Sequence, residues 1–380
     1  MHIILNVDAI QPPLTGIGHY ALQLARGLRR HSAIDDLRFF SAYRWLTDPD
    51  QALRANQVLA LARNRVPCKT LALHLYNFAR SQLFRWQTRH FHHHLLHTPN
   101  YILMPFAGAS VTTVHDLSYL HYPQHHPRER IAFMERQMPR TLAQATLIIT
   151  DAESVRQELI DQLGVPASRI QAVPLGVEDH FHPRTPTELA PVLNRYDLAD
   201  LAYLLVVGTL EPRKNLPRLI DAYSRLPETL RQRHPLIIVG ARGWLTEDLE
   251  RRLAPLEQSG QIRRLGYVAQ DDLPLLYAGA WAFAFPSLYE GFGLPVLEAM
   301  RSGIPVLTAN RSSLPEVAGD AAILIDPEDV DAITAGLERL LTDSAWRASA
   351  IDRGLEQSRR FSWERCVDET VAVYRKALAG

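Results

Sequence analysis

Two glutamates and a glycine turn follow the apolar run Ala282–Phe285. Glu290 comes directly before Gly291-Phe292-Gly293-Leu294, and Glu298 follows inside a predicted helix. Glycine lets backbone N–H groups approach a ligand closely, and a helix start after it attracts anions and hydroxyl oxygens. The two carboxylates could therefore accept hydrogen bonds from separate hydroxyls of one polyhydroxylated ligand. The alternative is a capped helix with solvated glutamates.

Positive charge follows a second apolar run, Leu204–Val207. Gly208 comes first, and Arg213 and Lys214 then precede a predicted helix over 215–224. The planar guanidinium of Arg and the point charge of Lys can together neutralise a diphosphate. Most Arg-Lys pairs are merely solvated, but the position after a strand and a glycine favours an anion-binding site.

A glycine pair and a histidine follow two other apolar runs. Gly16 and Gly18 lie between the run Ile3–Val7 and a predicted helix. Because the third glycine of a dinucleotide fingerprint is missing, we do not predict NAD binding, and a plain tight turn is the alternative. His115 ends a strand-like run. A lone histidine is often structural, but its strand-end position favours function, and Asp116 could orient it or cap the next segment.

Short apolar runs alternate with longer amphipathic stretches along the 380 residues. This alternation predicts buried parallel strands with helices on both faces, an α/β fold with two Rossmann-like, doubly wound domains. Ligands of such sheets bind outside the carboxyl ends of the strands, where the residues above lie. The predicted boundaries are 1–172, a linker at 173–184, 185–360 and a terminal segment at 361–380. The predicted strands are Ile3–Val7, Val111–Val114, Leu147–Thr150, Leu204–Val207, Leu236–Val239, Ala282–Phe285 and Pro305–Leu307.

Composition and charge argue against several classes of protein. The formal net charge of +0 is not that of a strongly cationic nucleic-acid binder. Cys68 and Cys366 lack zinc-binding spacing and are expected to be reduced core thiols. The first residues do not resemble a signal peptide, and no apolar segment reaches about 18 residues, so we expect a cytoplasmic protein.

Two D-x-D patterns and a histidine run raise the question of a metal. Asp48 and Asp50 lie in a polar turn, and Asp329 and Asp331 flank a helix start, where acidic residues suit the helix dipole. His92-His93-His94 lacks partners at metal-binding spacing and is interpreted as a local surface cluster. We therefore expect a metal-independent protein that needs no cofactor.

No acidic residue occurs between Asp50 and Asp116. A basic, aromatic, amphipathic segment of this kind is typical of a surface that meets anionic lipid headgroups. It could equally bind a phosphorylated acceptor or be a solvated helical face. Our hypothesis is peripheral attachment to the inner membrane leaflet through residues 51–97. The basic and aromatic residues concerned are Arg54, Arg63, Arg65, Lys69, Tyr76, Phe78, Arg80, Phe84, Arg85, Trp86, Arg89 and Phe91.

Together these motifs resemble the retaining nucleotide-sugar glycosyltransferases of the GT-B architecture, specifically family 4. The resemblance covers nearly the whole chain and implies the GT-B fold, in which two Rossmann-like domains face each other. Three motifs carry it: Glu290 and Glu298 match the E-x7-E motif, Arg213-Lys214-Asn215 the diphosphate-binding segment, and Val114-His115-Asp116 the histidine of the N-terminal domain. Two further segments look like the family's connections between domains. Val173–Val177 resembles the interdomain segment, and Phe361–Glu364 resembles the start of a terminal helix that crosses back to the first domain.

The resemblance also implies a role for each motif. Glu290 would bind the donor sugar hydroxyls and Glu298 the nucleotide ribose. Arg213 and Lys214, with the amides of the Gly291–Leu294 turn, would neutralise the diphosphate leaving group. Many family members have Arg directly after the glycine where this chain has Thr209, so the Arg role falls to Arg213. The other implied donor contacts are His115 at the sugar, Gly16 and Gly18 on the phosphate side, Tyr267 and Val268 at the base, and Gly208.

The resulting expectation is a retaining hexosyltransferase of bacterial surface polysaccharide or O-antigen assembly, with a glycan or lipid-linked acceptor. GDP-mannose is the favoured donor, and a UDP-sugar stays open. No carboxylate nucleophile matches, so we favour front-side displacement, in which the leaving phosphate helps to deprotonate the acceptor. Two other functions remain possible: a sugar-nucleotide epimerase of the same architecture, and a non-catalytic glycan- or membrane-binding relative.

Overall fold

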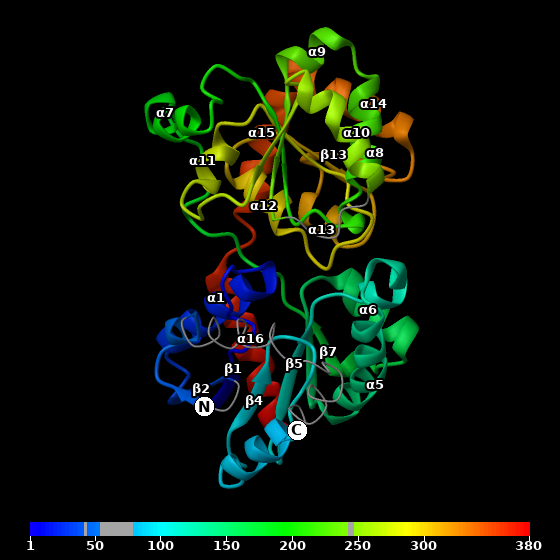
Figure 1. The fold of residues 1–380 in the computed structure, drawn as a ribbon. Coiled ribbons are helices and arrows are strands. Elements are labelled where there is room, and N and C mark those ends of the chain that lie inside the picture. The colour runs from blue at the N-terminus through cyan, green and yellow to red at the C-terminus, as the bar shows by residue number, and fades with distance from the viewer. Residues whose placement is uncertain (42–43, 54–78, 242–246) are drawn as a thin grey trace. The chain divides into compact units, whose positions relative to one another are not determined.

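The computed structural model describes residues 1–41, 44–53, 79–241 and 247–380 (Figure 1). The chain divides into two compact units. Unit 1 consists of Met1–Leu117, Pro127–Gly176 and Trp363–Gly380, and unit 2 of Ser118–His126 and Val177–Ser362. The division after Gly176 falls inside the predicted linker. Residues 118–126, which the predicted 1–172 domain includes, group with unit 2 instead. Within unit 2, Tyr122 Oη donates to the Leu288 carbonyl at 3.2 Å, and the Tyr122 and His121 rings contact Tyr289.

Unit 1 is built on a seven-stranded sheet in the order β3-β2-β1-β4-β5-β6-β7. Every pair is parallel except β2–β3, which is antiparallel. The strands are β1 (His2–Asn6), β2 (Asp36–Ser41), β3 (Arg44–Leu46), β4 (Leu95–Thr98), β5 (Ser110–Val114), β6 (Leu147–Thr150) and β7 (Ile170–Ala172). The main helices are α1 (Gly16–Arg30), α5 (Arg128–Gln144), α6 (Glu153–Leu163) and α16 (Trp363–Ala379), with a 3-10 turn η2 (Ala167–Arg169).

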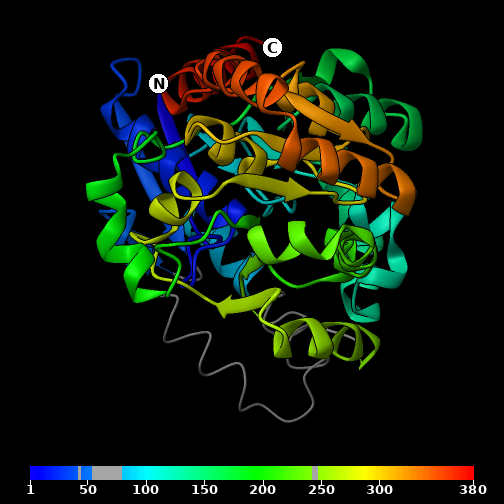
Figure 2. The ribbon, with the colours of Figure 1, turned by 90° about the horizontal axis from the view of Figure 1, so that it is seen from above.

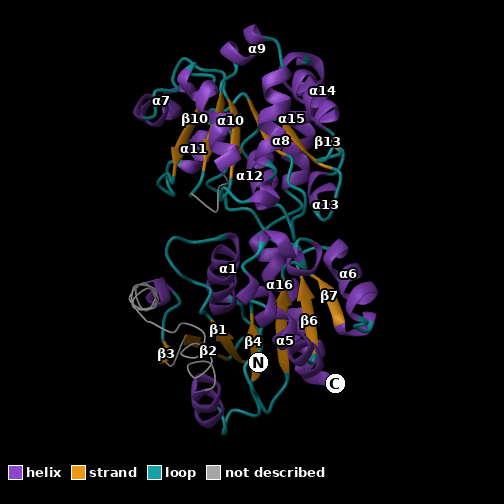
Figure 3. Cartoon of the chain, turned by 45° about the vertical axis from the view of Figure 1, so that its right-hand side comes forward, coloured by secondary structure: helices purple, strands orange, loops and turns teal. Residues whose placement is uncertain are grey.

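Unit 2 is built on a six-stranded, wholly parallel sheet in the order β10-β9-β8-β11-β12-β13. The strands are β8 (Leu204–Val207), β9 (Leu236–Val239), β10 (Ile262–Gly266), β11 (Ala282–Phe285), β12 (Val306–Ala309) and β13 (Ala322–Ile325). Helices lie on both faces of this sheet (Figure 3). They are α7 (Pro186–Arg195), α8 (Leu216–Arg225), α9 (Glu228–Arg233), α10 (Glu247–Gln258), α11 (Leu273–Ala278), α12 (Leu294–Arg301), α13 (Leu314–Ala318), α14 (Val330–Thr342) and α15 (Ser344–Ser358); the short elements are α4 (Ser118–His121), η1 (Pro123–His125) and η3 (Pro212–Lys214).

The predicted α/β fold class is confirmed: both sheets are doubly wound. In unit 2 the order of the strands reverses between β8 and β11, and in unit 1 between β1 and β4. The core of unit 2 forms where strand side chains such as Ile238 meet apolar residues of α8 and α14, and α14 lies along β13 (Figure 2). A doubly wound sheet binds its ligand at the reversal point, beyond the carboxyl ends of the strands. Residues that follow β8 and β11 are therefore the first to consider as a site.

The helices of the described ranges are all too short or too polar to form a membrane span.

Candidate functional site

The turn after β8 is shaped by two glycines in contact. Gly208 has a φ of 150° and Gly240, after the neighbouring strand β9, has a φ of 152°. A Cβ on Gly240 would lie 1.9 Å from the carbonyl oxygen of Gly208, so no larger residue fits there. The close approach lets the chain leave β8 sharply and run through η3 into α8. It thereby holds Arg213 and Lys214 at the reversal point of the sheet.

Lys214, Arg213 and Glu290 form a buried ion network. The Lys214 ammonium lies 2.7 Å from Glu290 Oε1, and the Arg213 guanidinium lies 2.8 Å from Glu290 Oε2. Arg213 also bonds Glu211 Oε1 at 2.6 Å and the carbonyl of Tyr289 at 2.5 Å. The two cations thus share the Glu290 carboxylate, and Glu211 supplies a second carboxylate to Arg213. An anionic ligand beside them would meet cationic groups that are already fixed in position.

Burial alone would raise the pKa of the Glu290 carboxyl, but Arg213 and Lys214 outweigh it and hold the pKa at about 2. Burial lowers the pKa of the Lys214 ammonium, and the Glu290 carboxylate opposes that shift. The state that suits this geometry is an ionised Glu290 between two charged partners. A carboxylate with both oxygens occupied in this way orients its neighbours and is a poor nucleophile.

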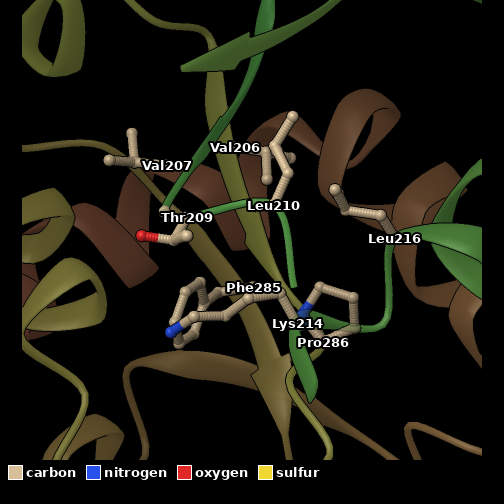
Figure 4. Close-up of a pocket in the computed structure, with 9 residues that line it drawn as sticks. Val206, Val207, Thr209, Leu210, Lys214, Leu216, Phe285 and Pro286 are labelled. Atoms are coloured by element: carbon tan, nitrogen blue, oxygen red, sulfur yellow. The ribbon is translucent and has the colours of Figure 1, made fainter. Parts of the chain in front are cut away.

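A pocket lies against the end of β8, and Val207, Thr209 and Lys214 are among the residues that line it (Figure 4). Its wall combines apolar side chains with the stem of Lys214, whose ammonium stands 4.7 Å above the centre of the Phe285 ring. A ring face attracts a cation, so Phe285 helps to keep the ammonium in place. The lining residues are Val206, Val207, Gly208, Thr209, Leu210, Lys214, Leu216, Phe285 and Pro286.

The glycine turn after β11 is held by two serines that sequence reasoning missed. Ser312 Oγ accepts the Glu290 N–H at 3.0 Å, and Ser313 Oγ donates to the carbonyls of Glu290 and Phe292 at 2.9 and 2.6 Å. Gly293 caps α12 with a φ of 117°, a conformation that favours glycine. The turn Gly291–Leu294 therefore presents its backbone in one conformation at the start of α12, as an anion or hydroxyl site requires.

Glu298 and the Tyr267–Val268 segment differ in how far their side chains are exposed. Glu298 is half-buried on α12. Burial and then the Glu298 carboxylate raise the pKa of the Tyr277 hydroxyl on α11, so Tyr277 stays neutral beside it. After β10, the side chain of Tyr267 is 62% exposed, whereas Val268 is buried. Tyr267 is thus available for stacking, whereas the Val268 side chain is packed inside unit 2.

In unit 1, His115 follows β5 and its partner is Asp151, which follows the adjacent strand β6. His115 Nδ1 lies 2.7 Å from Asp151 Oδ2, and His115 Nε2 lies 3.0 Å from the Pro99 carbonyl. A carbonyl only accepts, so Nε2 carries a proton. A second proton must then lie between Nδ1 and the carboxylate, because two acceptors would repel each other. The buried pair therefore holds this proton between its two side chains; burial raises the pKa of the Asp151 carboxyl, and the charge and hydrogen bond of His115 oppose that shift.

Charge explains the titration of this pair. Burial favours the neutral imidazole, but the charge and hydrogen bond of Asp151 outweigh it and raise the pKa of His115. Asp116, which the sequence analysis considered as the orienting group, acts on this pair through its charge, which raises the pKa of His115 less than Asp151 does. Burial first, and then Asp116, raise the pKa of the Tyr101 hydroxyl. The expected orienting carboxylate therefore exists, but it is Asp151.

Gly16 and Gly18 open α1. Gly16 is exposed, and Gly18 is buried with its N–H donating to the N-cap side chain of Thr15 at 3.3 Å. A Cβ on Gly18 would meet the Ala9 carbonyl and a Leu14 methyl, each at 3.0 Å. The neighbours would have to shift by a few tenths of an ångström to admit this Cβ, so the close packing favours glycine at position 18. The exposed Gly16 is the one a ligand can approach.

The basic stretch 51–97 is only partly described, since residues 54–78 lie outside the described ranges. Arg80 differs from the prediction of an exposed surface: its guanidinium pairs with Asp8, and burial lowers the pKa of Arg80 to about 10. Phe84 is fully buried. Trp86 is 61% exposed, and the Arg89 guanidinium lies 4.6 Å above its ring. Among the described residues of the stretch, Trp86 and Arg89 are therefore an exposed aromatic and basic pair in contact.

The acidic pairs with D-x-D spacing are engaged in other contacts. Asp48 pairs with Arg29 at 2.9 Å, and Asp50 pairs with Arg26 at 2.8 Å. The Asp329 side chain caps α14 by accepting two backbone N–H bonds. Of the cysteines, Cys366 is buried, and burial raises its pKa; Cys68 lies outside the described residues.

Comparison with known proteins identifies the family. Residues 197–357 match the Glycosyl transferases group 1 family, and residues 14–181 match Glycosyltransferase Family 4. O-antigen chain mannosyltransferase B of Escherichia coli is 40% identical over 379 residues, which cover 99% of this chain and 100% of that protein.

Two solved structures are also similar. WaaG, a glycosyltransferase involved in lipopolysaccharide biosynthesis, matches with a TM-score of 0.74 and 18% identity over 98% of this chain and 99% of that one. Anabaena HepE, crystallised in complex with UDP and glucose, matches with a TM-score of 0.72 and 17% identity over 99% of this chain and 100% of that one. Since the E. coli relative matches over its whole length and the two family descriptions together span both units, this chain belongs to the family 4 glycosyltransferases.

Proposed function

We propose that this glycosyltransferase moves mannose from GDP-mannose to a hydroxyl of a glycan or lipid-linked acceptor in bacterial O-antigen assembly, at the cytoplasmic side of the membrane. The observation that carries the proposal is the buried network of Arg213, Lys214 and Glu290 at the reversal point of unit 2. Fixed positive charge beside a strand-end glycine suits a nucleoside diphosphate leaving group. The choice of mannose rests on the 40% identity to O-antigen chain mannosyltransferase B.

Unit 2 is proposed to hold the donor, and unit 1 the acceptor. Lys214 and Arg213 stabilise the diphosphate, and the Gly291–Leu294 turn contributes backbone N–H groups. Glu290, already ionised, accepts hydrogen bonds from sugar hydroxyls, and Glu298 does so from the ribose. Tyr267 is exposed enough to stack on the base. Because the positive charge comes from side chains, the reaction is proposed to need no metal.

The proposed mechanism is front-side displacement with retention. The bond between the sugar anomeric carbon and the phosphate oxygen breaks, and the acceptor oxygen forms its bond on the same face. The acceptor proton moves to the departing phosphate. Glu290 does not suit the alternative double displacement, because both of its oxygens are within 2.8 Å of a cation. His115 adds a fixed positive charge whose orientation Asp151 controls.

The donor base is tested by thermal shift. GDP, UDP and ADP are added to the metal-free enzyme, and we expect GDP alone to raise Tm. A ligand at 100 times its Kd stabilises the folded state by about 2.7 kcal/mol. Glu298→Ala should lose most of the GDP shift, whereas Glu338→Ala, an exposed glutamate on α14, should keep it. If UDP alone raised Tm, the donor would be a UDP-sugar instead; UDP is the nucleotide in the HepE crystal. If none of the three nucleotides raised Tm, the proposal would lose its basis.

Product analysis distinguishes sugar transfer from the two alternative functions. A sugar-nucleotide epimerase would convert the donor with no acceptor present, and a non-catalytic relative would bind nucleotide without turnover. We expect GDP-mannose to persist without acceptor and a mannosylated glycan to form when one is supplied. Chromatography of the nucleotide sugars, with and without acceptor, distinguishes these three outcomes.

We further propose that Trp86, Arg85 and Arg89 attach the enzyme to an anionic membrane surface. All three are exposed, and an amphipathic aromatic side chain flanked by basic ones suits the headgroup region. At low salt the protein should sediment with vesicles that contain anionic lipid, and Trp86→Ser/Arg89→Ser should reduce the bound fraction. Arg128→Ser, an exposed arginine at the start of α5, serves as the control. Equal sedimentation of all three proteins would show that this surface is not the contact.

A further inference from the structure

Three polar residues lie side by side where β2, β1 and β4 begin. His2 is aligned with Asp36 in the β1–β2 ladder, and Ile3 is aligned with Leu95 in the β1–β4 ladder, so His94 is the next residue beside His2. Aligned residues on neighbouring parallel strands point to the same face, and the strands are only about 4.8 Å apart. The backbone register therefore brings two imidazoles and a carboxylate into one row.

The side chains of this row converge. Their potential ligand atoms all lie within 4.8 Å of one another. His94 Nε2 lies 3.1 Å from Asp36 Oδ2, and the His2 ring meets the His94 ring edge-on with 5.2 Å between centroids. Within the described ranges, no second group of three histidine, cysteine, aspartate or glutamate side chains converges in this way.

His94 has a feature that an ordinary surface histidine lacks. Its side chain is about nine-tenths buried, and its Nδ1 is a buried nitrogen to which no described residue offers a hydrogen bond. The neighbouring His92 and His93 are exposed. The prediction of one local surface cluster of three histidines is therefore wrong for His94, because the start of β4 turns it into the sheet beside His2 and Asp36.

We infer that His2, Asp36 and His94 form a binding site for Zn²⁺ or a similar borderline divalent cation. Two imidazoles and one carboxylate are a donor set that zinc uses, with a water as the fourth ligand. Bonds of about 2.0–2.2 Å place tetrahedral donor atoms roughly 3.4 Å apart, so a small rotation of the exposed His2 completes the geometry. Mg²⁺ prefers oxygen ligands and does not suit this set.

The position of the cation site in the sheet indicates a structural role. It lies at the edge where β2, β1 and β4 begin, whereas His115 and Asp151 follow the opposite, carboxyl ends of their strands. A cation here would fasten three strands of unit 1 together and would take no part in sugar transfer. Arg38 donates to Asp36 Oδ2 at 2.8 Å, so a bound cation must share this carboxylate with a positive neighbour.

Titration calorimetry with Zn²⁺ alone tests the site, using chelator-treated protein that carries no histidine tag. We expect one Zn²⁺ per chain for the unaltered protein. His94→Gln should weaken binding by at least about tenfold. Because His94 is buried and its variant could fold poorly, the exposed His2→Gln provides the same test and should show the same loss. Arg38→Gln should tighten binding, since it removes the competing cation.

The matched control is His92→Gln/His93→Gln, which removes two exposed histidines of the same run and should leave the affinity unchanged. Zn²⁺ should also raise Tm for the unaltered protein and for this control, but not for His2→Gln. The inference is overturned if no Zn²⁺ binds, or if the His92/His93 variant loses the site while His2→Gln keeps it. Sugar transfer should be the same with and without chelator, and a loss on chelation would place a metal elsewhere in the enzyme.

Discussion

Lys214→Met is expected to lower kcat by a factor of about 10²–10³, because it removes fixed positive charge from the side of the leaving diphosphate. Charge on the phosphate develops as the bond to the sugar breaks, so this contact is stronger in the transition state than in the bound donor. Methionine keeps the unbranched stem over Phe285, and Arg213 still neutralises Glu290. The measurement is steady-state kcat at saturating donor and acceptor.

The matched control is Arg225→Met, at the end of α8, the helix that follows Lys214 in the chain, where an exposed ion pair joins Arg225 to Asp331. Exposed pairs contribute little, so kcat should stay within about twofold. If Lys214→Met also kept kcat within that range, the diphosphate would have to be stabilised by other groups. A rise in donor KM with no change in kcat would mean that Lys214 binds the ground state and the transition state equally.

The residues of the unit 2 site could be predicted because each follows a buried strand. Leu204–Val207 and Ala282–Phe285 are continuous apolar runs, and the structure has strands with these same bounds. Residues that follow such runs meet at one edge of a parallel sheet, which is why Lys214 and Glu290 come within 2.7 Å although they are 76 positions apart in the sequence. Gly208, Gly291 and Gly293 could be predicted for the same reason, because they follow the same two apolar runs.

Several strands could not be predicted from apolar runs. In β10 two arginines interrupt the pattern, since this strand lies at the sheet edge and its side chains reach solvent-accessible partners such as Glu257. Strand β4 includes the buried His97, which bonds Thr113 and Tyr374 inside unit 1. A buried polar network of this kind cannot be distinguished from a loop by hydrophobicity alone.

The partner of His115 could not be predicted because it depends on strand order. Thr150 is aligned with Val114 in the β5–β6 ladder, so the residues that follow them, Asp151 and His115, are neighbours. Asp116 is adjacent in sequence, but successive residues leaving a strand point in opposite directions. A carboxylate directly after the apolar run Leu147–Thr150 was the available signal, and it becomes informative only once β5 and β6 are known to pair.

Asp151→Asn should destabilise unit 1 and make its stability less dependent on pH. The pKa of His115 is raised in the folded protein, so the stabilisation from the pair is fully present below the unfolded value of about 6.5 and is lost as pH rises through the folded pKa. Removing one partner of a buried pair costs about 3–5 kcal/mol. The loss should therefore be largest near pH 6 and should shrink toward alkaline pH, as denaturant unfolding at several pH values would show.

The chain offers a second histidine–aspartate pair as the control. His31 Nε2 lies 3.2 Å from Asp368 Oδ1, but Asp368 is 70% exposed, so Asp368→Asn should change stability little at any pH. In Asp151→Asn the imidazole loses its counter-charge, and nitrogen NMR should show that it titrates at a lower pH. If the loss of stability were the same at pH 6 and pH 9, the proton would not lie on His115, and a neutral histidine beside a protonated Asp151 would describe the pair. Since the fixed charge proposed for His115 requires the imidazolium, kcat of Asp151→Asn should fall as well, and more steeply as pH rises.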